Sequence, residues 1–408
     1  MSKVTKPVVL DETAKQVVAQ MQLQNEILTS LASGINYKPT SIKDVLNVVR
    51  AGQASKVFQV GDQIIVPWTD ITTGQKYDVP LDIVSFGTSA LQDGEELPSM
   101  TVQWHYATPF GVQFNQYQAF FYASEELAAG TYYIEIGTTW GNNCVSGKKY
   151  QFTLTKPVPA GGQLAGFRGA PDQAPSSWKV YSYNSKTAVD AIEIVAVTEG
   201  SSGTSLGVLR FGGDGKLNCL QRTAYGYNRW SQSAMRQWLN SDKGVGEWWT
   251  PQNDFDRCPD ELATKAGFLT GFDADFLEIL RPTKVVTALN TVTDSTSSNS
   301  VDPLETTYDK IYLPALEQMF IEPQLAGEGS AWDYWKRASN MTTKMKQYQT
   351  YPQIRTFAIE NHTSPQYVRL RSANRGYSCN TWYVDSSGYV GTSYAIGALR
   401  CAPACDFC

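Results

Sequence analysis

The chain has 408 residues, of which 18% are charged and 12% are aromatic, and its formal net charge is −5 at pH 7. This balance argues against nucleic acid as the main partner, because phosphate binding needs clustered Lys and Arg. No stretch approaches the ~18 continuous apolar residues of a membrane span, and no apolar segment near the N-terminus indicates a secretory signal peptide. The length suffices for two domains and an accessory element.

Residues 1–35 are predicted to form a helix that serves as an oligomerisation segment. Apolar residues recur there at heptad spacing, interrupted once by Gln24. The apolar positions are Leu10, Ala14, Val17, Met21, Leu28 and Leu31. A short parallel coiled coil would join copies of the chain, and we expect a homotrimer; the alternative is a single amphipathic helix that lies on its own domain. Such a short coil is marginally stable alone and would need support from the domains behind it.

Residues 36–165 are predicted to form a β-rich, sandwich-like domain, because short runs with a period of two alternate there with turn residues. Residues 156–177 hold four Pro and four Gly with little periodicity. This composition is typical of a connection between domains, and we place the linker at residues 166–177.

Residues 178–408 are predicted to form a second domain, rich in loops, with short strands and few helices. A helix is expected over residues 231–240, with Ser231 as its cap. The expected strands cover residues 192–197, 205–211, 284–288, 310–313 and 355–359. Together, the three parts predict an α+β protein with an N-terminal helix, a β-rich middle domain and a C-terminal domain of mixed structure.

Residues 372–408 contain no Lys, Glu, Gln or Met, although these four types make up 70 of the 408 residues. Tyr, Ser, Gly, Asn, Thr, Ala and Cys are frequent there instead. Tyr offers a broad amphipathic contact at low rotamer cost, and small polar residues adapt around it, as in antibody binding loops. The segment therefore predicts a recognition surface; the alternative is an ordinary loop-rich C-terminus.

Several short strings follow one another in this part of the chain. They are NRWSQS at 228–233, RQWLN at 236–240, YVRLRS at 367–372, NTWYVD at 380–385, SGYV at 387–390 and RCAP at 400–403. In order and spacing they resemble the variable proteins of diversity-generating retroelements. The resemblance covers residues 178–408 and implies a domain with the C-type-lectin fold, related to formylglycine-generating enzymes. These systems mutate adenines in codons that cannot become Lys, Glu, Gln, Met or Trp, which would explain the missing residue types.

The resemblance also implies roles for single residues. The hypervariable, ligand-binding positions would be Tyr377, Ser378, Cys379, Asn380, Tyr383, Asp385, Tyr389, Gly391, Thr392, Ser393, Tyr394, Ile396, Gly397 and Leu399. The framework positions would be Arg371, Trp382, Val384, Gly388 and Val390. Apolar and polar residues alternate over 382–385, which predicts a strand with one buried and one displayed face. Tyr383, Tyr389 and Tyr394 should then contribute most of the binding energy.

The other residue patterns that suggest chemistry are weaker, and a structural role is the simpler interpretation of each. Cys401, Cys405 and Cys408 have the iron–sulfur spacing CxxxCx(aromatic)C, but not the sequence context of such clusters. His105 and His362 are the only histidines, and neither lies near a Cys pair, so neither a zinc site nor a Ser-His-Asp arrangement is expected. The acidic residues lack the spacing of a calcium loop. We expect no catalytic residue, no metal and no cofactor.

These observations predict a non-enzymatic ligand-binding protein. The resemblance implies a phage tail or virion component for host attachment, which binds a host cell-surface protein or glycan. A trimer would present several copies of one binding surface and gain avidity. One alternative is a structural virion or surface protein whose lectin-like domain only packs against neighbours. The other is a metal-dependent oxidoreductase of the formylglycine-generating type, for which Cys379 and Cys401 would be the candidate cysteines.

Overall fold

The computed structural model describes most of the chain. The described residues are 38–116, 121–137, 145–160, 163–164, 179–180, 182–183, 195–209, 216–219, 225–252, 256, 258–290 and 303–408, with positions 17, 18, 21, 22, 25 and 29. They form a strand-rich fold with several sheets, which agrees with the predicted α+β class. We find no helix in these ranges that is both long enough and apolar enough to cross a membrane.

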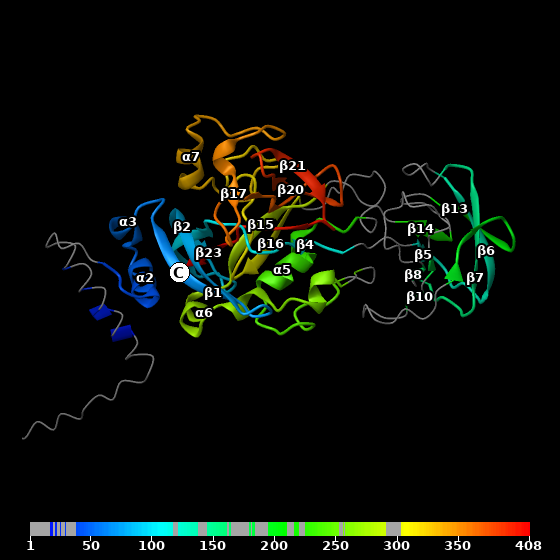
Figure 1. The fold of residues 1–408 in the computed structure, drawn as a ribbon, viewed down its shortest axis with the longest axis horizontal. Coiled ribbons are helices and arrows are strands. Elements are labelled where there is room, and N and C mark those ends of the chain that lie inside the picture. The colour runs from blue at the N-terminus through cyan, green and yellow to red at the C-terminus, as the bar shows by residue number, and fades with distance from the viewer. Residues whose placement is uncertain are drawn as a thin grey trace, which may run out of the picture.

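The central sheet combines strands from both ends of the described chain. Its strands are β1 (Gln63–Asp70), β2 (Gln75–Ala90), β3 (Glu96–Trp104) and β23 (Ala404–Phe407), in the order β1-β2-β3-β23. All neighbouring strands are antiparallel. Strand β23 pairs along β3 with Ala404 opposite Gln103 and Phe407 opposite Met100. The C-terminal strand therefore completes a sheet that begins near residue 63 (Figure 1).

Helix α2 (Ile42–Arg50) packs beside this sheet. It begins with a capping box, in which the Ser41 hydroxyl accepts a hydrogen bond from the Asp44 N–H and the Asp44 carboxylate accepts one from the Ser41 N–H. Its buried face is made of valine and leucine side chains. The Arg50 Nε donates to the carbonyl of Cys408 at 3.4 Å, so the C-terminal end lies against this helix (Figure 1). A short helix, α3 (Ala54–Val57), follows.

One hydrophobic core crosses the linker that the sequence predicts. The buried cluster contains residues from 45–114 and from 230–407. At its centre, Trp68 and Trp104 pack on Phe268 with ring centroids 5.4 and 5.2 Å apart, and the Trp68 indole donates to the Phe268 carbonyl. The structure thus differs from the predicted division into residues 36–165 and 178–408, because both ranges supply parts of the same sheet and the same core.

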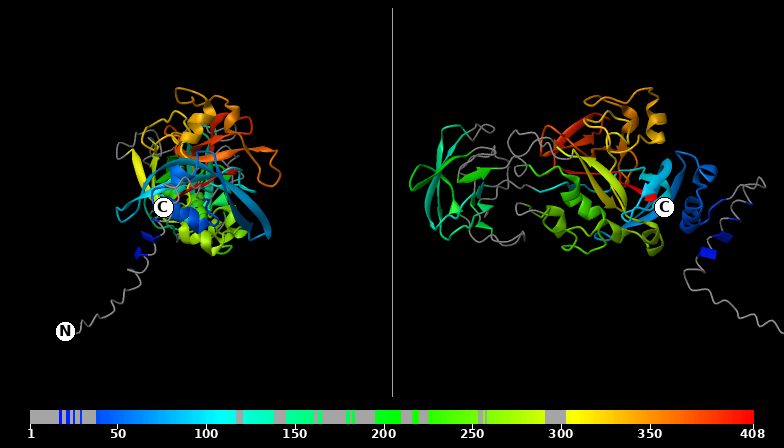
Figure 2. Two further views of the ribbon diagram at one scale, coloured as in Figure 1. Left: turned by 90° about the vertical axis from the view of Figure 1, so that its left-hand side faces the viewer. Right: turned by 180° about the vertical axis from the view of Figure 1, so that it is seen from behind.

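A second group of strands comes from residues 121–219 and forms three small sheets. The strands are β5 (Phe121–Ala123), β6 (Gly130–Ile136), β7 (Lys149–Leu154), β8 (Gln163–Leu164), β9 (Lys179–Val180), β10 (Ser182–Tyr183), β11 (Val195–Ala196), β12 (Thr198–Glu199), β13 (Thr204–Leu209) and β14 (Leu217–Cys219). Their orders are β10-β8-β5-β14, β12-β7-β6-β13 and β11-β9. This group lies at the end of the molecule opposite α2 (Figures 1 and 2). The predicted linker at 166–177 falls between β8 and β9, outside the described residues.

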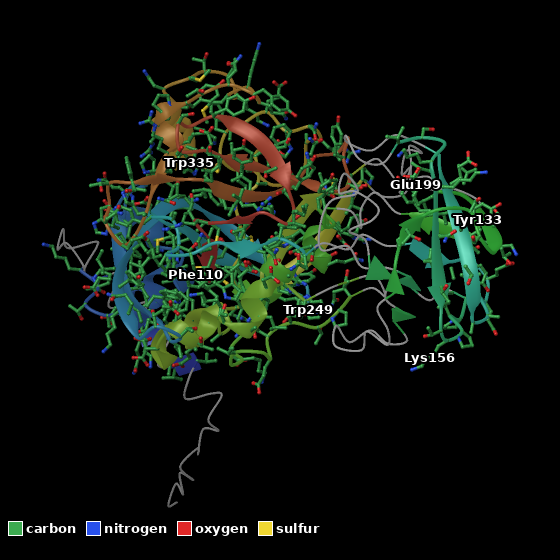
Figure 3. The ribbon with its side chains drawn as sticks, turned by 45° about the vertical axis from the view of Figure 1, so that its right-hand side comes forward. Phe110, Tyr133, Lys156, Glu199, Trp249 and Trp335 are labelled. Atoms are coloured by element: carbon green, nitrogen blue, oxygen red, sulfur yellow. The ribbon has the colours of Figure 1, made fainter. Side chains whose placement is uncertain are left out.

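The remaining elements surround the central sheet. The strands are β4 (Val112–Gln113), β15 (Thr283–Ala288), β16 (Leu304–Asp309), β17 (Thr356–Phe357), β18 (Pro365–Gln366), β19 (Val368–Ala373), β20 (Asn380–Val384), β21 (Val390–Tyr394) and β22 (Ala398–Leu399). They pair as β15-β16, β17-β18, β19-β20-β21 and β22-β4. The helices are α5 (Ala234–Leu239), α6 (Ala274–Ile279) and α7 (Asp333–Ser339), with the 3-10 helices η2 (Trp230–Gln232), η3 (Asp260–Ala263), η4 (Phe268–Gly271) and η5 (Pro352–Ile354). In Figure 3, Phe110, Trp249 and Trp335 mark this main body, and Tyr133, Lys156 and Glu199 mark the second group.

Of the helices and strands predicted between residues 231 and 313, some are present and one is not. The helix expected over 231–240 is present as α5, but its cap is Ser233, whose hydroxyl accepts from the Arg236 N–H at 3.0 Å. The strand expected over 284–288 is confirmed as β15. The strand expected over 310–313 is wrong, since Tyr312 forms only an isolated bridge with Ala404.

The predicted coiled coil lies outside the described residues, apart from six isolated positions, which are helical. Among these, Val17 and Met21 are exposed. The homotrimer stays a prediction.

We expect Phe407→Ala to lower the free energy of unfolding by about 3–5 kcal/mol, as for other buried aromatic residues. Phe407 is fully buried in β23 and packs edge-on against Phe276. Urea unfolding would measure the loss. The matched control, Phe407→Leu, keeps an apolar side chain there and should lose less. A loss within about 0.5 kcal/mol for Phe407→Ala, as at a surface site, would contradict the central role of β23.

Candidate ligand-binding surface

The predicted variable residues lie largely on the hairpin of β20 and β21. In its register, Trp382 lies opposite Thr392 and Tyr383 lies opposite Gly391. Trp382 is 0% exposed and packs against Tyr348 at 5.1 Å, and Val384 and Val390 are also buried. Tyr383 is half-buried. The hairpin thus has the alternation that the sequence predicts.

Asp385 holds the turn that joins the two strands. Its Oδ1 accepts hydrogen bonds from the N–H and hydroxyl of Ser387, at 2.7 and 2.6 Å, and from the N–H of Tyr389 at 2.9 Å. Partial burial alone would raise the pKa of Asp385, but these hydrogen bonds lower it below its ordinary value. Its carboxylate is therefore used within the turn, a role that differs from the predicted display to a ligand.

Gly388 closes the same turn in a conformation that favours glycine. Its φ is +87°, and a Cβ added there would lie 2.3 Å from the carbonyl oxygen of Tyr351. The Tyr351 N–H donates to the Gly388 carbonyl at 2.8 Å. No other residue fits without moving the backbone. This geometry explains why glycine is needed at the predicted framework position 388.

Asn228 binds the backbone of the loop that precedes β20. Its side-chain Nδ2 lies 3.1 Å from the carbonyl oxygen of Asn374 and 2.7 Å from those of Tyr377 and Asn380. Its backbone N–H donates to the carbonyl of Ser378. Asn228 is fully buried. One residue of the NRWSQS string therefore contacts four backbone carbonyls between residues 374 and 380, three of them at predicted variable positions.

Arg369 performs the same task at the same open end of the hairpin, on its other strand. Its Nη2 donates to the carbonyls of Tyr394 at 3.0 Å and Gly397 at 2.8 Å, and its Nη1 donates to the Thr381 hydroxyl. The guanidinium is fully buried, and burial lowers its pKa to about 9. Its main contacts to the variable segment are again with backbone oxygens.

Arg371, a predicted framework residue, is also fully buried. Its guanidinium donates to the carbonyls of Leu313, Val286 and Glu328, at 2.6, 3.1 and 2.6 Å. It also donates to the side chains of Thr287 and Gln318. Burial lowers its pKa, and the charge of Glu328 opposes that effect. Arg371 joins β19 to the segments around it.

Tyr367, Tyr383 and Tyr389 form what we name the tyrosine cluster. The rings of Tyr367 and Tyr383 lie 5.6 Å apart. A Cβ added at Gly391 would come within 2.8 Å of Cε1 of Tyr389 and 3.0 Å of the Tyr383 hydroxyl, so both rings lie over this glycine. Burial, followed by the negative charge of Asp385, raises the pKa of Tyr383. The cluster is a compact, partly exposed aromatic surface.

Tyr394 belongs to a separate group at the other end of the hairpin. It is 46% exposed and stacks on Tyr225, with ring centroids 4.1 Å apart and an interplanar angle of 12°. In the strand register, Tyr394 lies opposite Asn380. Tyr377 stands three residues before Asn380 and is 54% exposed. Strand alternation directs Tyr394 to the opposite face of the sheet from Gly391 and Tyr383. Of the three tyrosines predicted to contribute most of the binding energy, only Tyr383 and Tyr389 therefore lie together.

Three of the predicted ligand-binding positions are buried. Ser378 is 1% exposed and Cys379 is 2% exposed, because the loop that carries them is drawn inward by Asn228. Burial raises the pKa of the Cys379 thiol to about 12. Gly391 is covered by the tyrosine cluster. These side chains cannot contact a ligand in this structure, which corrects their assignment as displayed positions.

The other predicted positions reach the surface to differing degrees. Tyr377 and Tyr394 are exposed. The half-buried ones are Asn380, Tyr383, Asp385, Tyr389, Thr392, Ser393, Ile396, Gly397 and Leu399.

The three cysteines near the C-terminus are not arranged for metal chemistry in the part of the chain that the structure describes. Cys401, Cys405 and Cys408 are buried and unpaired. Burial raises the pKa of Cys401 to about 12 and that of Cys408 to about 11, so these thiols stay protonated. Within the described ranges, no three His, Cys, Asp or Glu side chains are grouped so that they could hold a metal ion. Enzymatic activity is neither indicated nor excluded by these facts.

Comparison with known proteins relates the second half of the chain to a family model. Residues 216–406 match a family model described as a domain of unknown function, DUF6273. The match begins at β14 and ends within β23, so it includes the hairpin and its framework but not strands β1 to β3. No curated protein and no solved structure matches the chain.

Two residues of this surface were not predicted from the sequence. Tyr367 precedes β19 and joins the tyrosine cluster, and Tyr225 supports Tyr394. The period of two along a strand could have identified Tyr367. This residue stands two positions before Arg369, and Arg369 lies opposite Tyr383 on the neighbouring strand, so the two tyrosines belong to the same face. No comparable signal identifies Tyr225, since it lies about 170 residues from its partner and their contact depends on tertiary structure.

We expect Asn228→Ala to lower the free energy of unfolding by about 1–3 kcal/mol, because buried carbonyls lose their donor. Tyr377→Ser removes a larger side chain from the same loop, but an exposed one, and should change stability by no more than about 0.5 kcal/mol. Chemical unfolding of both variants tests the comparison. Equal losses would show that Asn228 does not hold the loop.

We expect Trp382→Ala to lower the free energy of unfolding by about 3–5 kcal/mol, as for a buried aromatic residue. Tyr389→Ala should lower it by much less, because Tyr389 is half-buried. Thermal melting of the two variants separates framework from surface. A larger loss for Tyr389→Ala would place that residue in the core.

Proposed function

We propose that this protein binds a ligand through a diversified surface on the β20–β21 hairpin. The observation that carries the proposal is the way the hairpin is held. Asn228 and Arg369 bind the backbone carbonyls of Tyr377, Asn380, Tyr394 and Gly397, all of them predicted variable positions. Backbone carbonyls are present whatever the side chain is, so these positions can change without loss of the hydrogen bonds that fix their backbone.

The tyrosine cluster is the part of this surface that should contribute most to binding. Aromatic residues dominate the binding energy of protein interfaces, and Tyr pays little conformational entropy on contact. The cluster is already ordered by ring contacts, with Tyr367 against Tyr383. Preordered side chains bind at a lower entropic cost. Tyr394 on Tyr225 would form a second contact region.

The wider proposal follows from the resemblance in residues 178–408. The hairpin and its framework would belong to a domain of the C-type-lectin type. The protein would be a phage tail or virion component that attaches to a host cell-surface protein or glycan without enzymatic activity. A trimer joined through residues 1–35 would multiply weak single-site affinity by about 10²- to 10⁴-fold where its geometry permits simultaneous binding.

Sequencing the gene in closely related isolates tests the diversification. We expect substitutions at half-buried or exposed hairpin positions such as Tyr383, Tyr389 and Thr392, with Asn228 and Arg369 unchanged. A near-repeat of the 3′ end of the gene beside a reverse transcriptase should accompany them. Substitutions spread evenly over the surface would contradict the proposal and favour a structural protein.

A binding assay tests the tyrosine cluster directly. Labelled full-length protein would be titrated onto whole cells of a panel of bacterial strains and onto a glycan array. For any strain or glycan that binds, the double variant Tyr383→Ala and Tyr389→Ala should weaken binding by about tenfold or more. Tyr133→Ala, at a half-buried tyrosine of β6, is the matched control and should bind like the parent. Unchanged binding by the double variant, with a normal melting curve, would exclude the cluster.

A further inference from the structure

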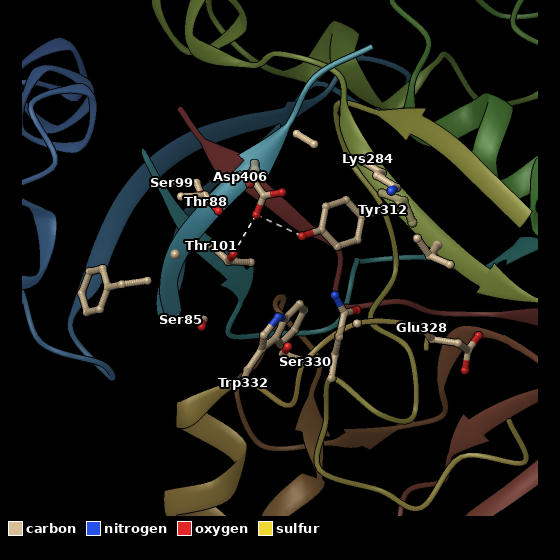
Figure 4. Close-up of a pocket in the computed structure, with 18 of the residues that line it drawn as sticks. Ser85, Thr88, Ser99, Thr101, Lys284, Tyr312, Glu328, Ser330, Trp332 and Asp406 are labelled. Carbon is tan, nitrogen blue, oxygen red and sulfur yellow. Dashed lines mark hydrogen bonds between the residues drawn. The ribbon is translucent and has the colours of Figure 1, made fainter. Parts of the chain in front are cut away.

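A polar cavity of about 540 Å³ lies on the central sheet, apart from the tyrosine cluster. Strands β2 and β3 form most of its floor, and β15 together with residues 328–332 lines its sides (Figure 4). Its volume is within the range of small-molecule sites, roughly 300–1,000 Å³. Its lining is rich in hydroxyl groups, with one indole.

The floor of this cavity is a row of polar residues on three neighbouring strands. Ser85 of β2 lies opposite Thr101 of β3, which lies opposite Asp406 of β23. In the next row, Gly87 lies opposite Ser99. A sheet face that packs against a core carries apolar side chains, so this face is not built for packing. Ser99 is only 5% exposed, and its hydroxyl makes no hydrogen bond with any part of the chain that the structure describes.

Asp406 determines what the floor can offer. Its Oδ1 accepts from the hydroxyls of Thr101 at 2.7 Å and Tyr312 at 3.1 Å, and its Oδ2 accepts from Thr283 at 2.8 Å (Figure 4). Of these hydroxyls, those of Thr101 and Tyr312 line the cavity; both have used their protons and can only accept further hydrogen bonds. Burial and the charge of Asp406 raise the pKa of Tyr312 well above its ordinary value, so it stays protonated. This end of the cavity therefore accepts hydrogen bonds from a ligand.

The opposite side of the cavity offers donors and a flat apolar face. The indole of Trp332 lies across from Asp406 (Figure 4). It is 4% exposed, and its Nε1–H, a donor only, has no partner among the described residues. Lys284 lines the rim on the Tyr312 side of the cavity (Figure 4) and makes no ion pair with another described residue. A ligand must therefore donate at one end, accept at the other, and present an apolar surface to the indole.

We propose that this cavity binds a saccharide unit. The hydroxyls of a sugar both donate and accept, and the C–H face of its ring packs on an indole. An ammonium ligand would leave the Trp332 donor without a partner, and an anion would find no donor in the hydroxyls that are bound to Asp406. The site is separate from the hairpin surface, so it can exist whether or not that surface binds a host.

Saturation-transfer NMR of the full-length protein with free methyl glycosides of glucose, galactose, mannose and N-acetylglucosamine tests this site. We expect at least one glycoside to bind with a Kd on the order of 1 mM, typical of a small ligand with few contacts. Trp332→Phe keeps the aromatic ring but removes the donor, and should weaken binding by about tenfold. Absence of transfer to all four glycosides would overturn the proposal.

A variant that fills the cavity tests whether glycosides bind there. A Cβ added at Gly87 meets nothing within 4 Å, so Gly87→Leu should fold and extend its side chain into the cavity. We expect it to abolish glycoside binding. Gly244→Leu, where the added Cβ meets only the Glu247 carboxylate at 3.5 Å, is the matched control and should bind like the parent. Binding that persists in folded Gly87→Leu would place the sugar elsewhere and refute this site. Loss of cell binding by the tyrosine variants would leave these results unaffected.

Discussion

The pairing of β23 with β3 determines where the predicted variable segment can lie. Because residues 404–407 are held in the central sheet and residues 368–373 form β19, the segment between them is fixed at both ends. Between these two ends, the chain forms the β20–β21 hairpin and one short strand, β22, which pairs with β4. A loop fixed in this way presents its side chains on a defined backbone, and preorganisation of this kind lowers the entropic cost of binding.

The hydrogen bonds that position the hairpin are directed at its main chain. Asn228 and Arg369 bind carbonyl oxygens, and Cys379 and Ala395 are joined by a backbone hydrogen bond. Where a side chain does shape the backbone, as Asp385 does in its turn, a substitution would remove three hydrogen bonds. The predicted variable positions therefore differ in how much a substitution would destabilise the fold. Some side chains, such as that of Asp385, stabilise the backbone, and others do not.

Much of the local structure could be predicted from the sequence, but little of the tertiary arrangement. The alternation over 382–385, helix α5 and strand β15 follow from periodicity and propensity over a few residues. The pairing of β23 with β3 joins residues about 300 positions apart, and no periodicity records such a contact. The inference drawn from the missing residue types was too broad. Residues 401–408 are all buried, so the absence there of Lys, Glu and Gln follows from burial, and only residues 374–399 require another cause.

Strand β19 connects the two surfaces of this molecule through its two buried arginines. Arg369 binds the carbonyls of the hairpin, whereas Arg371 binds those of Val286 and Glu328, which line the polar cavity. A planar guanidinium offers five donors in a fixed geometry, which a lysine cannot reproduce. Burying two such cations is costly. Oxygens accept from Nε, Nη1 and Nη2 of Arg371, whereas the buried Nε of Arg369 has no partner among the described residues. A shift of β19 would disturb both sets of carbonyls at once, so the hairpin and the cavity share one rigid support.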